Sequence, residues 1–488
     1  MAQAEGYKNI FKSTFLFGFV QVFNILFKVG INKVVAVLLG TAGMGVIALF
    51  QQATALLSSV CGLGINQSAV RDISEARESG DKQKVNLIIS LVRKIIRFTS
   101  LLGVIVTIIL SPWISQLTFG DNSYCVSYIC LSLVTGFMIQ NMGYLAINTG
   151  MRQLKNVAVA NLAGSIVGLV SAIPFYYFFR EKGIVPSLIV SSFATMIVSA
   201  YFARKVQYEK VKLSIQESIR KSKAIVTMGV SLMLMSMMLS LSSLILSSYI
   251  SHNGGIETVG LYQAGATIVV SYFAVIVSAM STEYYPRICG INHDNKALVE
   301  AVNRQSETGL IIALPLVVAF VFLIPYFLRF LYSEAFIRSS EYTDYAIIGS
   351  IAIICSNCMG MVLLAKQNAK LFLISSLICN VIILGINILM YKTLGLTGLG
   401  LGYAVNGLFQ LLMYQIIMKI EYQISFSRTT IINLVICMSA ALCAGVFRHL
   451  YIEWVRWLCG TVLFILSLIY TLYYMRHKMG LNLRFILK

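Results

Sequence analysis

Charge is scarce in this sequence of 488 residues, and acidic charge is scarcest of all. Asp, Glu, Lys and Arg together make up 12% of the chain, and only 19 residues are acidic. No Asp or Glu lies in the middle of a long apolar run. This argues against an exporter of cations, which normally carries a buried carboxylate. It also argues against a membrane glycosyltransferase or polymerase, which needs catalytic carboxylates.

Catalytic and metal-binding patterns are missing as well. The four histidines lie in loops or at predicted helix ends, and no P-loop, HExxH or GxSxG motif is present. The ten cysteines are scattered. Cys355 and Cys358 have CxxC-type spacing on an apolar helix without histidine, which is typical of small core residues. We therefore predict a protein that is not an enzyme and that uses no cofactor or metal, and the sequence identifies no coupling ion.

Apolar residues are abundant, at 58% of the chain with a mean hydropathy of +0.81. Long uncharged runs recur from end to end, each long enough for a helix that crosses a bilayer. The sequence therefore predicts an all-α polytopic membrane protein with about 14 transmembrane helices. The predicted spans are 13–39, 46–64, 97–114, 124–147, 157–179, 185–203, 224–250, 259–281, 308–328, 343–364, 371–391, 398–418, 429–447 and 455–475.

The formal net charge of +19 follows mainly from topology. Most Lys and Arg residues fall in segments on the side of the N-terminus, whereas the opposite loops hold few. By the positive-inside rule, both termini are predicted to be cytoplasmic. We therefore expect no nucleic-acid partner, and we expect the basic segment 204–223 to lie on the anionic inner leaflet.

The two halves of the chain repeat each other. Gly45, Arg71, Arg152 and Gly183 recur at similar intervals as Gly260, Arg287, Lys366 and Gly395. Such repeats are common in alternating-access transporters, with the substrate site between the halves. We predict two pseudo-symmetric six-helix lobes and an added helix pair. Their bounds are 1–203 for the N-terminal lobe, 204–223 for a linker, 224–418 for the C-terminal lobe and 419–488 for helices 13 and 14 with the tail.

The first span carries a polar stripe formed by Gln21, Asn24, Lys28 and Asn32. At 3.6 residues per turn these side chains share one face of a helix. A cation such as Lys28 near mid-membrane costs about 2.5–3.5 kcal/mol on insertion scales, so the stripe is expected to face a hydrated cavity. The alternative is that these groups hydrogen-bond to neighbouring helices.

The first pair of helices in each half is polar on one face. The second span carries Gln51, Gln52 and Thr54, and the eighth carries Tyr262 and Gln263. We predict that these residues line the central cavity together with the stripe of the first span. A site with a cation and amide donors, and no buried acid, suits an anion such as a phosphate or diphosphate.

Four repeat-matched cations lie at predicted cytoplasmic helix ends: Arg71, Arg152, Arg287 and Lys366. They are candidates for a cytoplasmic gate or for guiding an anionic head group, and the alternative is simple anchoring at the interface. Nearby, Arg304 and Glu307 have the i,i+3 spacing of a surface ion pair.

Four stretches of sequence resemble polysaccharide repeat-unit flippases, the Wzx type within the multidrug/oligosaccharidyl-lipid/polysaccharide exporter superfamily. They are VVAVLLGTAGMGVIALFQQATALLSSVCGLGINQSAVRDISE (34–75), ISQLTFGDNSY (114–124), LAINTGMRQLKN (145–156) and LLAKQNAKLF (363–372). The resemblance implies a lipid-linked oligosaccharide on undecaprenyl diphosphate, flipped across the bacterial inner membrane for O-antigen and lipopolysaccharide biosynthesis. It also implies membrane lipids, a polysaccharide polymerase and a chain-length regulator as candidate partners.

The resemblance leaves alternatives open. Some relatives carry an acidic residue in the eighth span, whereas GATIVVSYFAVIV (265–277) has none, so proton coupling by that route is not expected. A drug or small-molecule antiporter of the same superfamily is one alternative. A flippase for a peptidoglycan lipid precursor is another. In related lipid flippases the last helix pair helps to form a groove for the lipid tail.

Overall fold

The computed structural model describes residues 23, 26–206, 208, 209, 211, 215–272, 284, 285, 287–366 and 368–478. Within these residues the chain is helical and contains no β-strand. The chain divides into two compact units, Met1–Gly260 and Leu261–Lys488, which we describe separately. The repeat-based lobe boundaries at 203, 223 and 418 remain a prediction.

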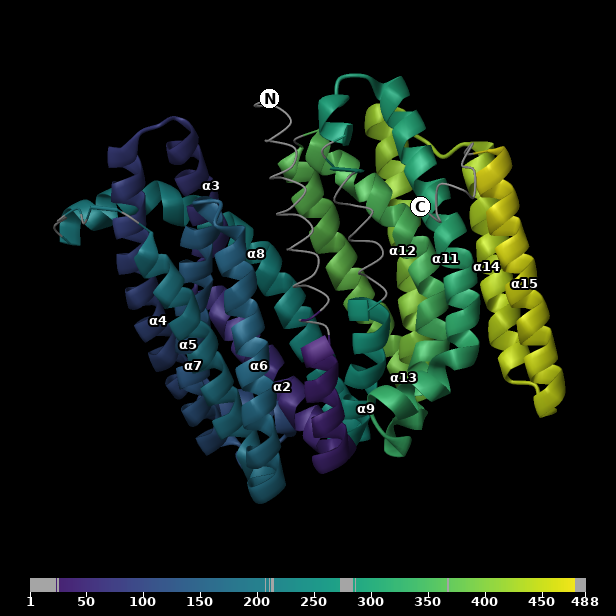
Figure 1. The fold of residues 1–488 in the computed structure, drawn as a ribbon, viewed down its shortest axis with the longest axis horizontal. Coiled ribbons are helices and arrows are strands. Elements are labelled where there is room, and N and C mark those ends of the chain that lie inside the picture. Colours follow the sequence, from purple (N-terminus) through teal and green to yellow (C-terminus); the bar gives the residue numbers. More distant parts are fainter. Residues whose placement is uncertain are drawn as a thin grey trace. The chain divides into compact units, whose positions relative to one another are not determined.

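The first unit contains the helical segment 26–38 and most of the N-terminal helices (Figure 1). These are α2 (Gly40–Cys61), α3 (Ile65–Glu78), α4 (Lys82–Phe119), α5 (Cys125–Gly150), α6 (Leu154–Phe179), the 3₁₀ turn η1 (Arg180–Gly183), α7 (Ile184–Lys205), α8 (Ile215–Gly254) and the start of α9 (Ile256–Ala266). Helix α5 packs between α4 and α7, and α8 packs on α2, α3 and α4.

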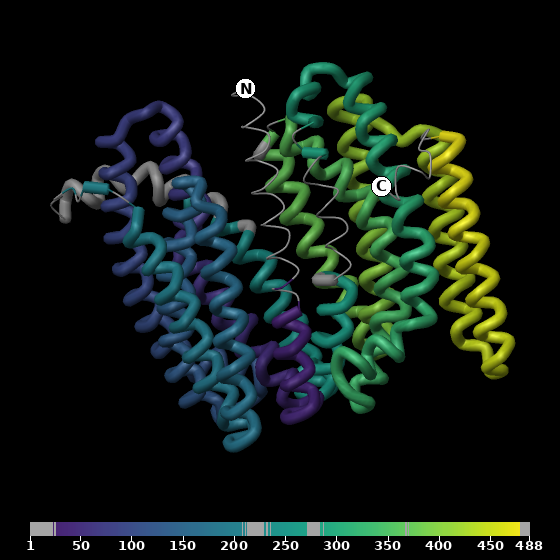
Figure 2. The backbone as a smooth tube through the Cα atoms, viewed as in Figure 1, coloured from purple at the N-terminus to yellow at the C-terminus, as the bar shows by residue number. Residues whose placement is uncertain are grey.

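The second unit contains the rest of α9 and the C-terminal helices. These are the π-helical turn η2 (Thr267–Tyr272), α11 (Asn295–Leu331), the 3₁₀ turn η3 (Glu334–Ser339), α12 (Ser340–Ala365), α13 (Ala369–Tyr422), α14 (Arg428–Arg448) and α15 (Glu453–His477). Helices α14 and α15 form an antiparallel hairpin (Figure 2), and both pack against α11.

Nine helical stretches of the described residues are long and apolar enough to cross a membrane. Two of them, Leu154–Lys205 and Lys370–Tyr422, are 52 and 53 residues long. Because about 20 residues suffice for one crossing, each holds two of the predicted spans. The prediction of an all-helical membrane protein with many spans is therefore confirmed.

The breaks inside these two long stretches fall at repeat-matched glycines. Gly183 ends the turn η1 between α6 and α7. Gly395 interrupts α13 with φ 60° and ψ −137°, a conformation that side chains with a Cβ rarely adopt. The sequence repeat therefore marks equivalent turning points of the chain.

The turn between α2 and α3 depends on Gly64. Its φ is 59°, and an added Cβ would lie 2.0 Å from the carbonyl oxygen of Gly229 on α8. Only a residue without a side chain allows this approach. Beyond the turn, α3 buries Ile65, Ala69 and Ile73 in a core shared with α4, α5 and α7. The polar segment after the second predicted span is therefore helical as α3, while α4 begins at Lys82, before the predicted span 97–114.

Candidate functional site

The polar stripe of the first span is described only in part, because Gln21 and Asn24 lie outside the described residues. Lys28 is exposed and Asn32 is half-buried on the helical segment 26–38. Gly30 of this segment lies against α6. Lys28 lies two residues earlier, about 200° around the helix, so it faces away from the contact at Gly30. Its amine is therefore not enclosed by α6.

The polar residues of α2 differ in accessibility. Gln51 is exposed and Gln52 is half-buried, whereas Thr54 is 3% exposed. The Thr54 hydroxyl donates to the carbonyl of Phe50 at 2.8 Å and lies 3.1 Å from that of Gln51. Such back-bonding to the preceding turn satisfies the hydroxyl within its own helix. In this structure Gln51 is accessible, and Thr54 is packed into unit 1.

The predicted cavity residues of the second unit lie beside a π-helical turn. Tyr262 and Gln263 are both half-buried on α9. The ring of Tyr262 meets Tyr342 of α12 edge-on, with centroids 5.2 Å apart and an interplanar angle of 84°. Immediately after α9 the chain widens into the π-turn Thr267–Tyr272, a distortion that is frequent at functional sites. Hydrophobic periodicity gave no indication of this turn.

Two of the four predicted gate cations hold a helix end to a polar segment that precedes it in the chain. Arg152, just after α5, pairs with Glu78 at the end of α3. In the second unit, Lys366 follows α12 in the same repeat position. Its amine donates to the Asn292 carbonyl and, at 2.7 Å, to Asn295 Oδ1. The matched residues therefore make equivalent tethers, each within its own unit.

The other two cations are exposed. Arg71 lies on α3 beside Asp72, where partial burial raises the pKa of the Asp72 carboxyl while the charge of Arg71 opposes the rise. In the second unit, Arg287 donates to Gln305 Oε1 of α11 at 3.2 Å and stacks over the Tyr284 ring. Arg71 and Arg287 are thus exposed, as is Arg152, while Lys366 is half-buried.

Two contacts made by side-chain amides inside the second unit were not found by sequence reasoning. Asn406 donates to Asn387 Oδ1 at 2.9 Å, which joins the two arms of α13 on either side of Gly395. Ser356 of α12 lies 3.4 Å from Gln410 Oε1. A single amide in an apolar stretch of sequence does not indicate which residue it contacts, so these contacts are known only from the fold.

One end of α14 is held by a buried ion pair. Arg448 and Asp344 of α12 lie 2.5 Å apart, and their side chains are 11% and 4% exposed. Arg448 also donates to the Val321 carbonyl of α11 at 2.5 Å. Both residues lie at ends of predicted spans, 343–364 and 429–447, and the sequence alone does not pair them.

The other end of the hairpin is held by Glu307 of α11. Its carboxylate accepts hydrogen bonds from Thr430 of α14 at 2.8 Å and Tyr474 of α15 at 2.7 Å. The expected pair between Arg304 and Glu307 is wrong, since Arg304 bonds Glu300 one turn earlier at 3.0 Å. Glu307 points instead to the added helices, where two hydroxyl donors satisfy it.

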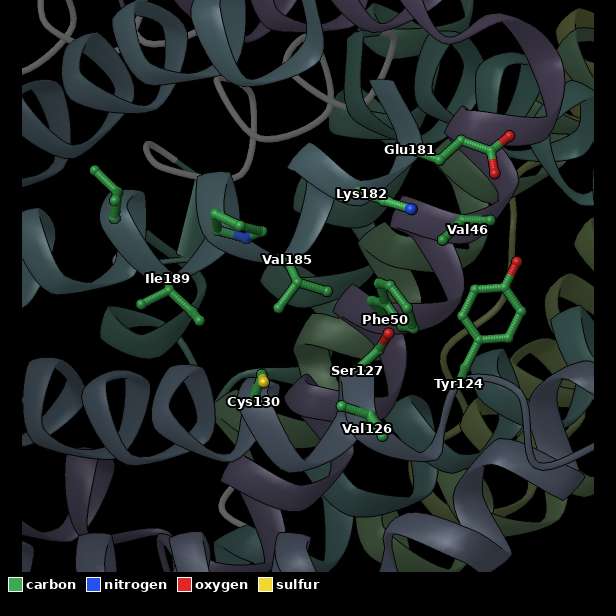
Figure 3. Close-up of a pocket in the computed structure, with 12 residues that line it drawn as sticks. Val46, Phe50, Tyr124, Val126, Ser127, Cys130, Glu181, Lys182, Val185 and Ile189 are labelled. Atoms are coloured by element: carbon green, nitrogen blue, oxygen red, sulfur yellow. The ribbon is translucent and has the colours of Figure 1, made fainter. Parts of the chain in front are cut away.

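A cavity of about 570 Å³ lies within the first unit. Figure 3 shows side chains of α2, α5 and α7 around it, with Glu181 and Lys182 of η1 among them. None of its lining residues belongs to the predicted substrate path. Across the described residues, no group of three or more His, Cys, Asp or Glu side chains is placed to hold a metal ion; Cys355 and Cys358 are buried in α12.

Comparison with known proteins identifies the family. A family model described as "Polysaccharide biosynthesis protein" matches residues 10–291, more than half of the chain. The chain belongs to the polysaccharide biosynthesis protein family. The chain is also similar to the Lipid III flippase of Escherichia coli (strain K12), with 20% identity over 358 residues, which cover 71% of this chain and 82% of the relative.

Solved structures share the fold of this family member. The lipid II flippase MurJ in an inward closed conformation has a TM-score of 0.74 at 14% identity, covering 95% of this chain and 99% of that chain. An inward-facing multidrug resistance transporter of the MATE family and MOP superfamily has a TM-score of 0.64 at 17% identity, covering 82% and 94%. The chain therefore shares the fold of these two solved structures.

Proposed function

We propose that this protein is a flippase that moves an undecaprenyl-diphosphate-linked oligosaccharide from the cytoplasmic to the outer leaflet of the bacterial inner membrane. The observation that carries the proposal is the family match over residues 10–291. Similarity to a lipid III flippase and the transporter fold support it. Alternating access by two related halves would supply the movement without catalysis.

The chemistry of the first helix fits an anionic head group. Lys28 is exposed, and among the described residues it has no carboxylate within ion-pair distance. A cation in that position needs an anion or water to offset its cost in the membrane. In the proposal, Lys28 binds the diphosphate, and amide and hydroxyl groups bind the sugars. The set comprises Gln21, Asn24, Asn32, Gln51, Gln52, Tyr262 and Gln263. Thr54 of the predicted set is left out, because its hydroxyl is buried and bonded within α2.

The cytoplasmic cations divide by role in this proposal. Arg71 and Arg287, which are exposed, guide the head group toward the site. Arg152 and Lys366, which bond within their units, hold helix ends in place. Surface polysaccharide assembly would place a polymerase and a chain-length regulator downstream as partners.

A peptidoglycan lipid precursor is the second candidate substrate. The similarity in fold to the lipid II flippase favours this candidate. The TM-score is 0.74, and the matched region covers 99% of the lipid II flippase chain. Both candidates share a lipid diphosphate and differ in the sugars.

Complementation separates the two candidates. The full chain is expressed in an Escherichia coli strain lacking its lipid III flippase and in a strain depleted of its lipid II flippase. We expect surface polysaccharide to return in the first strain, or in a strain that lacks an O-antigen flippase, without growth of the second. Growth of the depleted strain alone would assign the peptidoglycan precursor, and failure in every strain with normal membrane expression would contradict the flippase proposal.

A further inference from the structure

The cavity of the first unit lies at the end where α2, α5 and α7 begin. Its floor is formed by Val46 and Phe50 of α2, which are 4% and 1% exposed. Phe50 is fixed by edge-on contacts with Phe119 and Tyr128, at centroid distances of 5.6 and 5.2 Å. Because these ring contacts hold Phe50 in place, the floor of the cavity is formed before a ligand binds. The cavity volume is in the range of sites for small molecules.

The walls of this cavity are largely apolar and continue into exposed apolar faces of α5 and α7. Val126 of α5 and Val190 of α7 line it and are both exposed. The same faces continue with exposed Ile129 and Leu133 on α5 and exposed Phe193 on α7. Because α5 and α7 are apolar enough to span a membrane, acyl chains would cover these faces. A hydrocarbon chain can therefore enter between the two helices.

The mouth of the cavity carries one charge of each sign. Glu181 and Lys182 lie side by side on the turn η1 and are both exposed (Figure 3). The turn is held in place by Arg180, which donates to the Leu38 carbonyl at 3.0 Å. Tyr124, whose ring stacks on Phe119 at 3.8 Å, completes the rim. A zwitterionic head group would match this pair of charges, whereas a purely anionic one would meet the Glu181 carboxylate.

We propose that this cavity binds one phospholipid with a phosphoethanolamine head group. The acyl chain fills the space between α5 and α7 over Phe50. The phosphate pairs with Lys182, and the primary ammonium donates to Glu181. The site is separate from the proposed substrate path, so it does not depend on the identity of the transported lipid.

Cys130 offers a direct probe, because it lines the cavity and its side chain is exposed. Cys443 on α14 is also exposed and is the internal control. The purified full chain in detergent is treated with a maleimide after addition of phosphatidylethanolamine, phosphatidylcholine or phosphatidylglycerol with identical acyl chains. Labelling at each cysteine is measured by peptide mass spectrometry.

We expect phosphatidylethanolamine to slow labelling of Cys130 and to leave Cys443 unchanged. Glu181→Gln should weaken this protection about tenfold, since it removes a charged hydrogen bond. Lys182→Gln should weaken it similarly, and Glu257→Gln, at an exposed acid outside the cavity, is the matched control. Equal protection by all three lipids, or by phosphatidylcholine as well as phosphatidylethanolamine, would overturn the head-group assignment. Absence of protection by any lipid would overturn the site.

Discussion

Replacing Arg448 with Met is expected to destabilise the second unit by about 3–5 kcal/mol, because it strands a buried carboxylate. The Asp344 side chain is 4% exposed, and Arg448 is its ion-pair partner at 2.5 Å. The same substitution also removes the donor to the Val321 carbonyl. The expected cost is therefore far above that of an exposed pair, which is about 0–1 kcal/mol.

A double-mutant cycle isolates the ion pair from other losses. Asp344→Leu combined with Arg448→Met removes both charges, so the double variant should recover most of the stability lost in Arg448→Met. Arg338→Met is the matched control, since Arg338 pairs with Glu341 at 3.5 Å while both are exposed. The free energy of unfolding is measured by titrating a denaturing detergent into micelles and following helix content. The reasoning would be refuted if Arg448→Met lowered the free energy of unfolding by less than about 1 kcal/mol. It would also be refuted if the effects of the two single substitutions simply added up in the double variant.

Three further substitutions test local contacts. Gly64→Ala should strongly reduce the yield of folded protein, because its Cβ would lie 2.0 Å from a carbonyl oxygen. Gly80 also has a positive φ but nothing within 4 Å of an added Cβ, so Gly80→Ala should cost about 1–2 kcal/mol of unfolding free energy. Comparable folded yields of the two variants would contradict this reasoning. Tyr474→Phe removes a donor to Glu307 at 2.7 Å and should lower the unfolding free energy by about 1.5–3 kcal/mol; no change in the detergent titration would contradict that role. Ser427→Ala removes the cap that accepts from the Thr430 amide and should cost about 0.5–2 kcal/mol, with Ser427→Gly costing less; equal effects would argue against capping.

Much of the helical architecture follows directly from the sequence. A membrane-spanning helix must be apolar along its length, so each span is visible as a run of residues. The repeat adds turning points, and Gly183 and Gly395 both lie where the chain reverses. The equivalence of Arg152 and Lys366 also has a structural counterpart, because both tether a helix end.

The polar contacts between helices were beyond sequence reasoning. Asp344 and Arg448 are far apart in the sequence, at the start of α12 and the end of α14. Glu307 accepts hydrogen bonds from α14 and α15, the added helix pair of the sequence analysis. Hydrophobicity identifies helices but does not determine which neighbours meet. The cavity at Phe50 was missed for the same reason, since most of its lining residues are ordinary apolar positions on α2, α5 and α7, and its two charges lie on the turn η1.

The measurement that tests the account most directly is lipid translocation by Lys28→Ala in vesicles. The purified chain is reconstituted with a fluorescent undecaprenyl-diphosphate oligosaccharide, and the label exposed on the outer leaflet is followed by quenching. We expect the wild type to move the lipid and Lys28→Ala to lose at least about 30-fold in rate, since truncating one partner of a charge pair costs about 2–5 kcal/mol. Lys28→Arg should keep partial activity, and Lys392→Ala, at an exposed lysine outside the proposed path, should keep full activity. Wild-type translocation by well-folded Lys28→Ala would contradict the central role of this cation.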